Sequence, residues 1–402
     1  MTRINKTWLQ LITALVVGGG VYWFLFRPAA IQVAKIAVAI PQSGEDAISG
    51  AELKAGLDLM RMEIQKGDLL PHDYRPVIEI HDDRSTEAGA RAAAYAIASD
   101  PNVIAVVGHF SSANTLSALP IYRNAGLPVI MPVATLTTIT ESGQYPNAFR
   151  LPPNNELQAQ TVAAFIVERL KFAQFFMISD DTEYARNLAF SIENSLRNHR
   201  VQLVGIETIP RGTQNFPILA ALAAFDPPLE AIIFVGYSPE AVYLARQLKL
   251  SGHLEATLVC TDGVYGTRFR DSDGADGAYV IYQVPPKEQL NNRDQWRRYA
   301  TEFERRNPAM NPEGWAAWSY DALGIAHSAI RASLRLGRVP RATHVISVLQ
   351  GSADSTPFEY RGVLGDYEFD RHGDNRHGHY HVYKVVNGEY VWQWSYGSGI
   401  KE

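Results

Sequence analysis

The sequence lacks several features that would point to particular functions. Cys260 is its single cysteine among 402 residues, which excludes an intrachain disulfide and a cysteine-based zinc site. The net charge of −5 leaves no surplus of basic residues for binding nucleic acid. There is no Gly-x-Ser-x-Gly elbow, phosphate-binding loop or dinucleotide fingerprint, and no low-complexity segment. We therefore expect a globular protein that is not an enzyme and uses no cofactor.

The N-terminus carries the one long hydrophobic run. Two basic residues precede an uncharged stretch over residues 8–26, which ends at Arg27. As a helix at ~1.5 Å per residue this stretch would reach ~28 Å, close to the thickness of a bilayer core. We predict that residues 1–32 form an uncleaved transmembrane signal anchor that holds the rest of the chain outside the plasma membrane. A signal peptide cleaved after Ala29 or Ala30 is the alternative.

From Val33 onward, short apolar runs alternate with amphipathic stretches, which is typical of βαβ units and parallel sheets. The run at residues 35–40 reads as a strand, and the apolar residues from Leu53 to Ile64 recur at helical spacing. Further strands are expected at 77–81, 103–107, 129–131, 172–178, 202–206, 231–235, 257–260, 366–369, 380–385 and 390–394, the last ones antiparallel. Further helices are expected at 156–170, 184–196, 216–224, 239–250, 295–305 and 315–334.

The two halves of this pattern resemble each other. An apolar strand leads into Gly108-His109 and then a helix, and the same order recurs at Gly236-Tyr237. Ligands of open α/β sheets bind beyond the carboxyl ends of the strands. The sequence therefore predicts two doubly wound, Rossmann-like lobes whose strand ends face a common ligand in a cleft.

Polar residues follow several of the predicted strands. Ser111 and Ser112 stand where a helix begins, and free N–H groups with a serine hydroxyl suit a carboxylate there; simple N-capping is the alternative. Thr135 also offers a hydroxyl to a carboxylate, while Val133 or Ala134 offers a carbonyl to an ammonium group, although these residues alone would read as a turn.

Three more candidates lie at strand ends in the second half. Asp262 could balance a ligand ammonium, or form a simple turn with Gly263. Tyr184 and Tyr237 could cover an apolar part of the ligand while their hydroxyls stay hydrogen-bonded. Together the candidates predict a small zwitterionic ligand.

The chain after residue 33 resembles the leucine/isoleucine/valine-binding proteins of ABC transporters, which have the type I periplasmic-binding fold. No single motif is diagnostic, but their order and spacing are specific. The resemblance rests on Ser43-Gly44, Gly56, Asp82-Asp83, Gly108-His109, Ser111-Ser112, Pro132 to Thr135, Phe149-Arg150, Tyr184, Gly236-Tyr237, Pro239-Glu240, Asp262-Gly263, Phe369-Asp370 and Gly373-Asp374.

The resemblance implies roles for these residues. It places Ser112, Ala134 and Thr135 on the α-amino and α-carboxyl groups of an amino acid, with Tyr184, Tyr237 and Asp262 closing from the other lobe. Ser49 stands where the branched-chain binders place an aromatic residue over the ligand, which leaves the ligand's side chain open. The implied partners are an amino acid and ABC permease subunits, in the periplasm or on the outer face of the plasma membrane.

The resemblance also implies three hinge segments between the lobes. The first lobe then comprises residues 33–152 plus about 288–360, and the second lobe comprises residues 153–287 plus about 361–402.

Two alternatives remain at this point. The closed lobes could signal to a membrane receptor instead of delivering solute to a permease. The chain could also bind a metal through His377, His379 and His381, which share one face if they lie on a strand. A straight strand separates the outer two by ~13 Å, which is too far for one ion without a bend.

Overall fold

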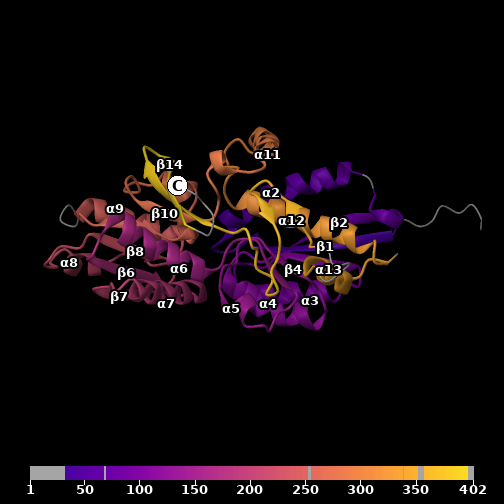
Figure 1. Ribbon diagram of the computed structural model, residues 1–402, viewed down its shortest axis with the longest axis horizontal. Helices are drawn as coiled ribbons and strands as arrows, with labels where there is room; N and C mark the ends of the chain where they lie inside the picture. Colours follow the sequence, from indigo (N-terminus) through magenta and orange to yellow (C-terminus); the bar gives the residue numbers. More distant parts are fainter. Residues whose placement is uncertain (1–31, 68, 252–254, 338, 352–356, 397–402) are drawn as a thin grey trace, which may run out of the picture.

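The chain folds into two lobes that lie side by side (Figure 1), each built around its own β-sheet. A computed structural model describes residues 32–67, 69–251, 255–337, 339–351 and 357–396. The predicted membrane-spanning stretch at residues 8–26 lies outside the described residues. Within the described part of the chain, no helix combines the length and the apolar character needed to cross a bilayer.

The first lobe contains a five-stranded parallel sheet in the order β2-β1-β3-β4-β5. Its strands are β1 (Gln32–Ile40), β2 (Tyr74–Asp82), β3 (Val103–Gly108), β4 (Val129–Met131) and β5 (Ala148–Arg150). Its helices are α2 (Ala47–Lys66), α3 (Glu87–Ala98), α4 (Ser112–Asn124), α5 (Thr138–Glu141), α11 (Arg293–Arg306), α12 (Trp315–Ser333) and α13 (Ala342–Leu349).

The alternation of residue size along β1 explains how these helices are layered. Ile36, Val38 and Ile40 belong to the apolar core shared with α2 and α12, whereas Ala37 and Ala39 belong to the core shared with α3 and α4. Successive strand residues point to opposite faces of the sheet. β1 therefore presents large side chains to α2 and α12 and small ones to α3 and α4.

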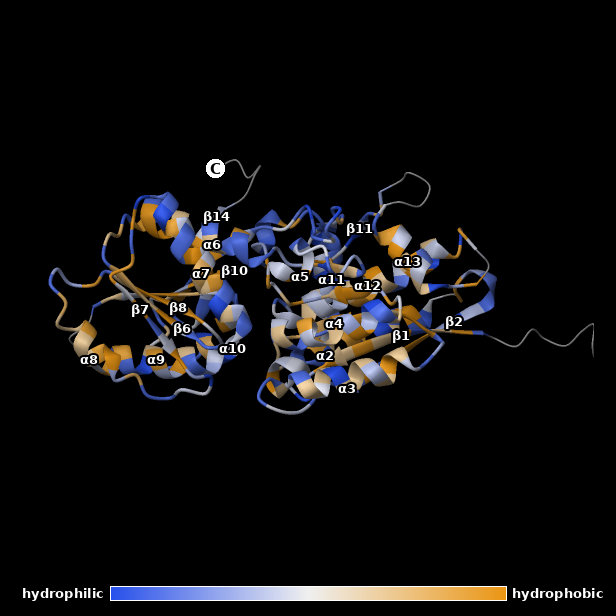
Figure 2. Cartoon of the chain, turned by 90° about the horizontal axis from the view of Figure 1, so that it is seen from below, coloured by the Kyte–Doolittle hydropathy of each residue, from blue (hydrophilic) through white to orange (hydrophobic). Residues whose placement is uncertain are grey.

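The second lobe contains a seven-stranded sheet in the order β14-β13-β10-β9-β8-β6-β7. Its strands are β6 (Phe175–Asp180), β7 (Gly205–Ile209), β8 (Ala231–Val235), β9 (Thr257–Cys260), β10 (Tyr279–Tyr282), β13 (Tyr380–Val386) and β14 (Glu389–Tyr396). The last two run antiparallel, as predicted for the C-terminus. Its helices are α6 (Asn155–Ala164), extended by a π-helical turn (Phe165–Leu170), α7 (Glu183–Asn198), α8 (Ile218–Leu222), α9 (Ser238–Ser251) and α10 (Thr267–Arg270). Figure 2 shows hydrophobic strands inside each lobe, flanked by helices of mixed hydropathy.

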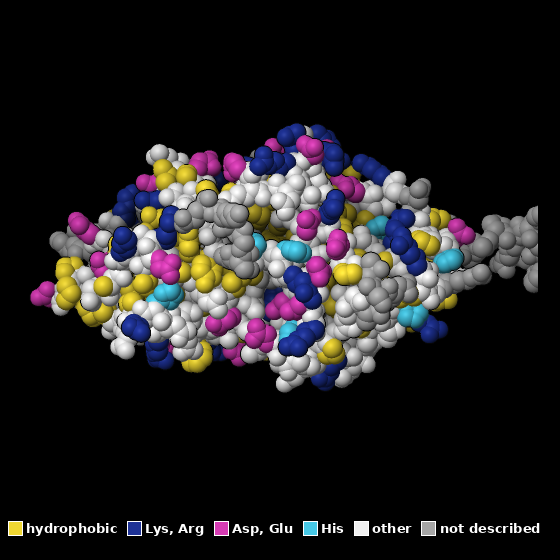
Figure 3. Space-filling model, viewed as in Figure 1, with side chains coloured by type: hydrophobic (Ala, Val, Ile, Leu, Met, Phe, Trp, Pro, Cys, Tyr) yellow, Lys and Arg dark blue, Asp and Glu magenta, His cyan; other side chains and the backbone are white. Residues whose placement is uncertain are grey.

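Charged side chains of both signs are intermixed on the face seen in Figure 3. This distribution agrees with the small net charge of the sequence.

The chain crosses between the sheets after β5, after β10 and before β13. Arg150 fastens the first and last crossings together. Its buried guanidinium donates to the carboxylate of Asp374 at 2.7 and 2.9 Å, and its backbone nitrogen donates to the carbonyl of Gly373 at 2.7 Å. These contacts join two of the three crossings of the hinge.

A short two-stranded sheet, β11 (Tyr360–Arg361) with β12 (Asp366–Tyr367), precedes the last crossing. Asp321 of α12 holds it, because its carboxylate accepts hydrogen bonds from the backbone nitrogens of Val363 and Leu364 and from the Tyr367 hydroxyl. The division of the chain into lobes predicted from the sequence remains a proposal. Because these contacts tie residues 363–367 to α12 of the first lobe, they favour a last crossing between the lobes that follows Tyr367 and not residue 360.

Candidate functional site

A small cavity lies between the lobes at the carboxyl ends of their strands. Its volume of about 20 Å³ is room for little more than a water molecule, so a larger ligand enters only if the lobes separate. Seven of the eight predicted contact residues line it. The lining residues are Phe110, Ser112, Val133, Ala134, Thr135, Tyr184, Tyr237, Asp262, Gly263 and Trp315.

The two neighbouring serines have separate roles in the structure. Ser111 caps α4, since its hydroxyl accepts a hydrogen bond from the backbone nitrogen of Asn114 at 3.2 Å. Ser112 lines the cavity instead, and its Oγ accepts from the backbone nitrogen of Leu136 at 3.3 Å. The N-capping alternative therefore holds for Ser111, whereas the carboxylate contact expected of Ser112 stays a prediction.

The loop after β4 is held in place from two sides. Ser112 binds its far end through Leu136, and the carbonyl of Thr135 accepts from the backbone nitrogen of Asn155 at 2.9 Å, at the start of α6. Thr135 and Ala134 are buried. The loop therefore presents its hydroxyl and backbone groups in a fixed arrangement at the cleft.

Asp262 is a buried carboxylate at the end of β9, with 3% of its surface exposed. Tyr184 donates a hydrogen bond to its Oδ1 at 2.5 Å, and the same hydroxyl lies 2.9 Å from Oγ1 of Thr261. Burial raises the pKa of Asp262 to about 6, although the hydrogen bond from Tyr184 favours the ionised form. A cationic group placed beside Asp262 would remove this destabilisation of its charge.

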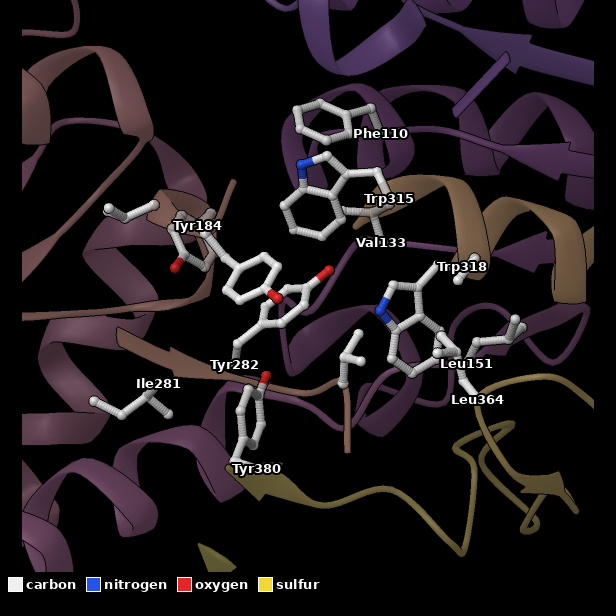
Figure 4. Packing of buried hydrophobic residues seen from close by; sticks show 14 of the residues in the cluster. Phe110, Val133, Leu151, Tyr184, Ile281, Tyr282, Trp315, Trp318, Leu364 and Tyr380 are labelled. Carbon is white, nitrogen blue, oxygen red and sulfur yellow. The ribbon is translucent and has the colours of Figure 1, made fainter. Parts of the chain in front are cut away.

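Aromatic side chains from both lobes surround the cavity. Figure 4 shows Phe110 and Trp315 above a group of tyrosines that includes Tyr184 and Tyr282. The rings of Phe110 and Trp315 meet edge to face with 5.5 Å between centroids, and those of Tyr184 and Tyr237 lie 5.4 Å apart. Such walls suit an apolar or planar part of a small ligand.

An ion pair crosses the cleft beside these aromatic residues. Arg211 follows β7 in the second lobe, and its Nη2 lies 3.0 Å from Oδ1 of Asp46, which precedes α2 in the first lobe. The guanidinium also stacks 3.9 Å from the Tyr237 ring centroid and lies 3.3 Å from Glu240 Oε1. This pair therefore joins the two lobes when the cleft is closed.

Ser49 is the one predicted contact residue outside the first cavity. It lines an adjoining cavity of about 60 Å³, near the start of α2.

Sequence reasoning missed three residues of the site. Phe110 stands between the quoted Gly108-His109 and Ser111, so its position was a usable signal. Trp315 and Arg211 come from distant segments with no local motif, and only the fold brings them to the cleft.

The histidines near the C-terminus do not form the alternative metal site. His377, His379 and His381 line a separate cavity of about 530 Å³ near the hinge. His381 bonds through Nδ1 to the hydroxyl of Ser395 at 2.7 Å, and burial lowers its pKa to about 3. Over the residues that the structure describes, no three metal-binding side chains come together.

The sequence profile of one protein family, described as periplasmic binding protein, matches residues 33–389. The chain belongs to this family. The match spans both lobes and all three crossings, and it establishes the α/β periplasmic-binding fold expected from the sequence.

Curated relatives carry names of the same kind. The chain is 24% identical over 355 residues to Leu/Ile/Val-binding protein homolog 1 of Brucella suis. This alignment covers 88% of this chain and 90% of the relative. The chain is 26% identical over 353 residues to an amino acid binding protein of Pseudomonas aeruginosa, with 87% and 89% covered. The family and these relatives are binding proteins, not enzymes, as the missing catalytic motifs predicted.

Solved structures share the fold at lower identity. A leucine binding protein from Thermotoga maritima aligns with a TM-score of 0.79 at 20% identity, over 91% of this chain and 99% of that one. A branched-chain amino acid binding protein from Streptococcus pneumoniae, in complex with isoleucine, aligns with a TM-score of 0.78 at 21% identity, over 90% and 99%. A solute binding protein from R. palustris, in complex with benzoate, aligns at 0.76 with 18% identity, over 90% of this chain and 96% of that one.

Proposed function

We propose that this protein is an extracytoplasmic solute-binding protein that captures an amino acid between its lobes and presents it to an ABC permease. The observation that carries the proposal is the interlobe cavity, where Ser112 and Thr135 of one lobe face Tyr184 and Asp262 of the other. Hydroxyl and backbone donors on one side and a buried carboxylate on the other suit the two charges of a zwitterion. The names of the curated relatives support the same ligand class.

The amino acid binds the first lobe before the second. Its carboxylate meets Ser112 and Thr135, while the carbonyl of Val133 or Ala134 accepts from its ammonium group. Closure about the hinge then brings Tyr184, Tyr237 and Asp262 over it. Ligand charge compensates Asp262, and Arg211 pairs with Asp46 across the cleft, so both contacts favour the closed form that a permease would recognise.

The N-terminal run would hold this binding protein at the outer face of the plasma membrane. That part of the proposal rests on the sequence of residues 8–26 alone.

Titration calorimetry of the purified full chain tests the binding function. The ligands are the common amino acids, small amides, urea and divalent metal ions. At least one amino acid is expected to bind, and the heat should vanish when its α-ammonium or α-carboxylate is blocked. Binding of metals without any amino acid would refute the proposal.

Two adjacent serines provide a matched pair of variants. Ser112→Ala removes a hydroxyl that lines the cavity and is expected to weaken binding about tenfold or more. Ser111→Ala removes only the cap of α4, so it should lower stability by about 1 kcal/mol and leave affinity unchanged. If both variants bind the amino acid as tightly as the wild type does, Ser112 does not belong to the site.

A further inference from the structure

The cavity that contains Ser49 adjoins the first one. The two share Phe110, Tyr237, Gly263 and Trp315 as lining residues. When the lobes separate to admit an amino acid whose α-groups occupy the first cavity, its side chain would point past Trp315 toward the second. The residues peculiar to the second cavity then select the side chain.

Glu52 is the one carboxylate of the second cavity that pairs with no other described residue. It follows Ser49 by three residues on α2, so both lie on the same helical face. The other two carboxylates of this cavity, Glu45 and Asp46, both face Arg211, at 4.0 and 3.0 Å. Among the described residues, no ion pair or hydrogen bond reaches the half-buried side chain of Glu52.

The surroundings of Glu52 are poorly solvating. Burial alone raises its pKa to about 7, and no basic group counteracts this effect. The start of α12 lies close to it, since a Cβ placed on Gly314 would be 3.3 Å from Oε2 of Glu52. The carboxyl group thus lies between α2 and α12, next to Trp315.

We propose that Glu52 selects the ligand's side chain, and that the protein prefers amino acids whose side chain ends in N–H donors: ammonium, guanidinium or carboxamide. This inference rests on the proposed amino-acid binding function and deepens it. A leucine side chain in the second cavity would remove water from Glu52 and offer it no hydrogen bond, whereas an N–H donor would satisfy it.

The basic residues of the cavity do not reverse this preference. Arg211 is already neutralised by Asp46 at 3.0 Å and Glu240 at 3.3 Å. Arg268 is exposed to solvent at the mouth, where water screens its charge. An acidic ligand side chain would meet Glu52 as a like charge.

Calorimetry of the full chain with lysine, arginine, glutamine, leucine and isoleucine tests the inference. At least one of the first three is expected to bind about tenfold or more tightly than leucine. Glu52→Gln should weaken lysine or arginine binding about tenfold and leave leucine unchanged or tighter.

Glu87→Gln is the matched control, because it removes the same charge from a side chain on α3 that is 61% exposed and lines neither cavity. It is expected to leave all affinities unchanged. The inference is overturned if leucine or isoleucine binds most tightly, or if Glu52→Gln and Glu87→Gln behave alike. If none of these or the other amino acids binds, the proposed function itself fails, which is a different result.

Discussion

Replacing Asp262 by asparagine should stabilise the empty protein near neutral pH while it weakens ligand binding. Asparagine has nearly the same shape and keeps an oxygen that accepts from the Tyr184 hydroxyl, but it carries no charge. The pKa of Asp262 rises from its ordinary 3.8 to about 6 because burial disfavours the ionised carboxylate. At about 1.4 kcal/mol per pH unit, that rise corresponds to about 3 kcal/mol.

The number of protons bound to the folded and unfolded protein determines how the stability difference changes with pH. Between about pH 4 and 6 the folded protein holds a proton on Asp262 that the unfolded chain has released, so this group lowers the stability of the wild type as pH rises. The asparagine side chain of the variant does not titrate in this range. The free energy of unfolding of Asp262→Asn, minus that of the wild type, is therefore expected to increase by up to about 3 kcal/mol from pH 4 to pH 8.

Urea unfolding at several pH values measures this difference, and calorimetry at pH 7.5 measures the loss of amino-acid affinity. We expect that loss to reach about a hundredfold, because the ligand ammonium would lose its charged partner. Asp294→Asn is the control, since that carboxylate is 81% exposed. A stability difference that does not change with pH would show that burial of Asp262 has no energetic consequence and refute the reasoning.

Three further predictions concern the closure, the hinge and the core. Arg211→Ala removes the ion pair with Asp46 across the cleft, so ligand affinity should fall about tenfold to a hundredfold in calorimetry, with a larger radius of gyration in scattering. Arg150→Met leaves Asp374 without its buried partner and should destabilise the fold by about 3–5 kcal/mol in urea unfolding. Cys260 is buried and burial raises the pKa of its thiol, so a thiol reagent should label it only in denaturant.

Each of these has an outcome that contradicts it. Wild-type affinity in Arg211→Ala would mean that the ion pair does not contribute to closure. A loss below about 1 kcal/mol in Arg150→Met would remove the hinge role of that arginine. Rapid labelling of Cys260 in native buffer would contradict its position in the core of the second sheet.

Secondary structure followed local pattern wherever the pattern was strong. The strands expected at 231–235 and 257–260 have these bounds in the structure, because each is a continuous apolar run inside a parallel sheet. β10 (Tyr279–Tyr282) and α13 (Ala342–Leu349) were missed. β10 is short, but Asp276-Gly277 precedes it and Pro285-Pro286 follows it, so the sequence offered boundary signals that were not used.

The sequence by itself determined the alternation of strands and helices, the strand ends where polar residues gather, and the family resemblance that the profile match then confirmed. Only the tertiary structure decided that Ser111 caps α4 while Ser112 faces the cleft, and that Trp315, Arg211 and Glu52 line the two adjoining cavities. The physical reason is the separation along the sequence between the residues that interact. Caps, strands and turns depend on neighbours a few residues away, whereas a cleft between two lobes is assembled from segments hundreds of residues apart, whose contacts leave no local pattern.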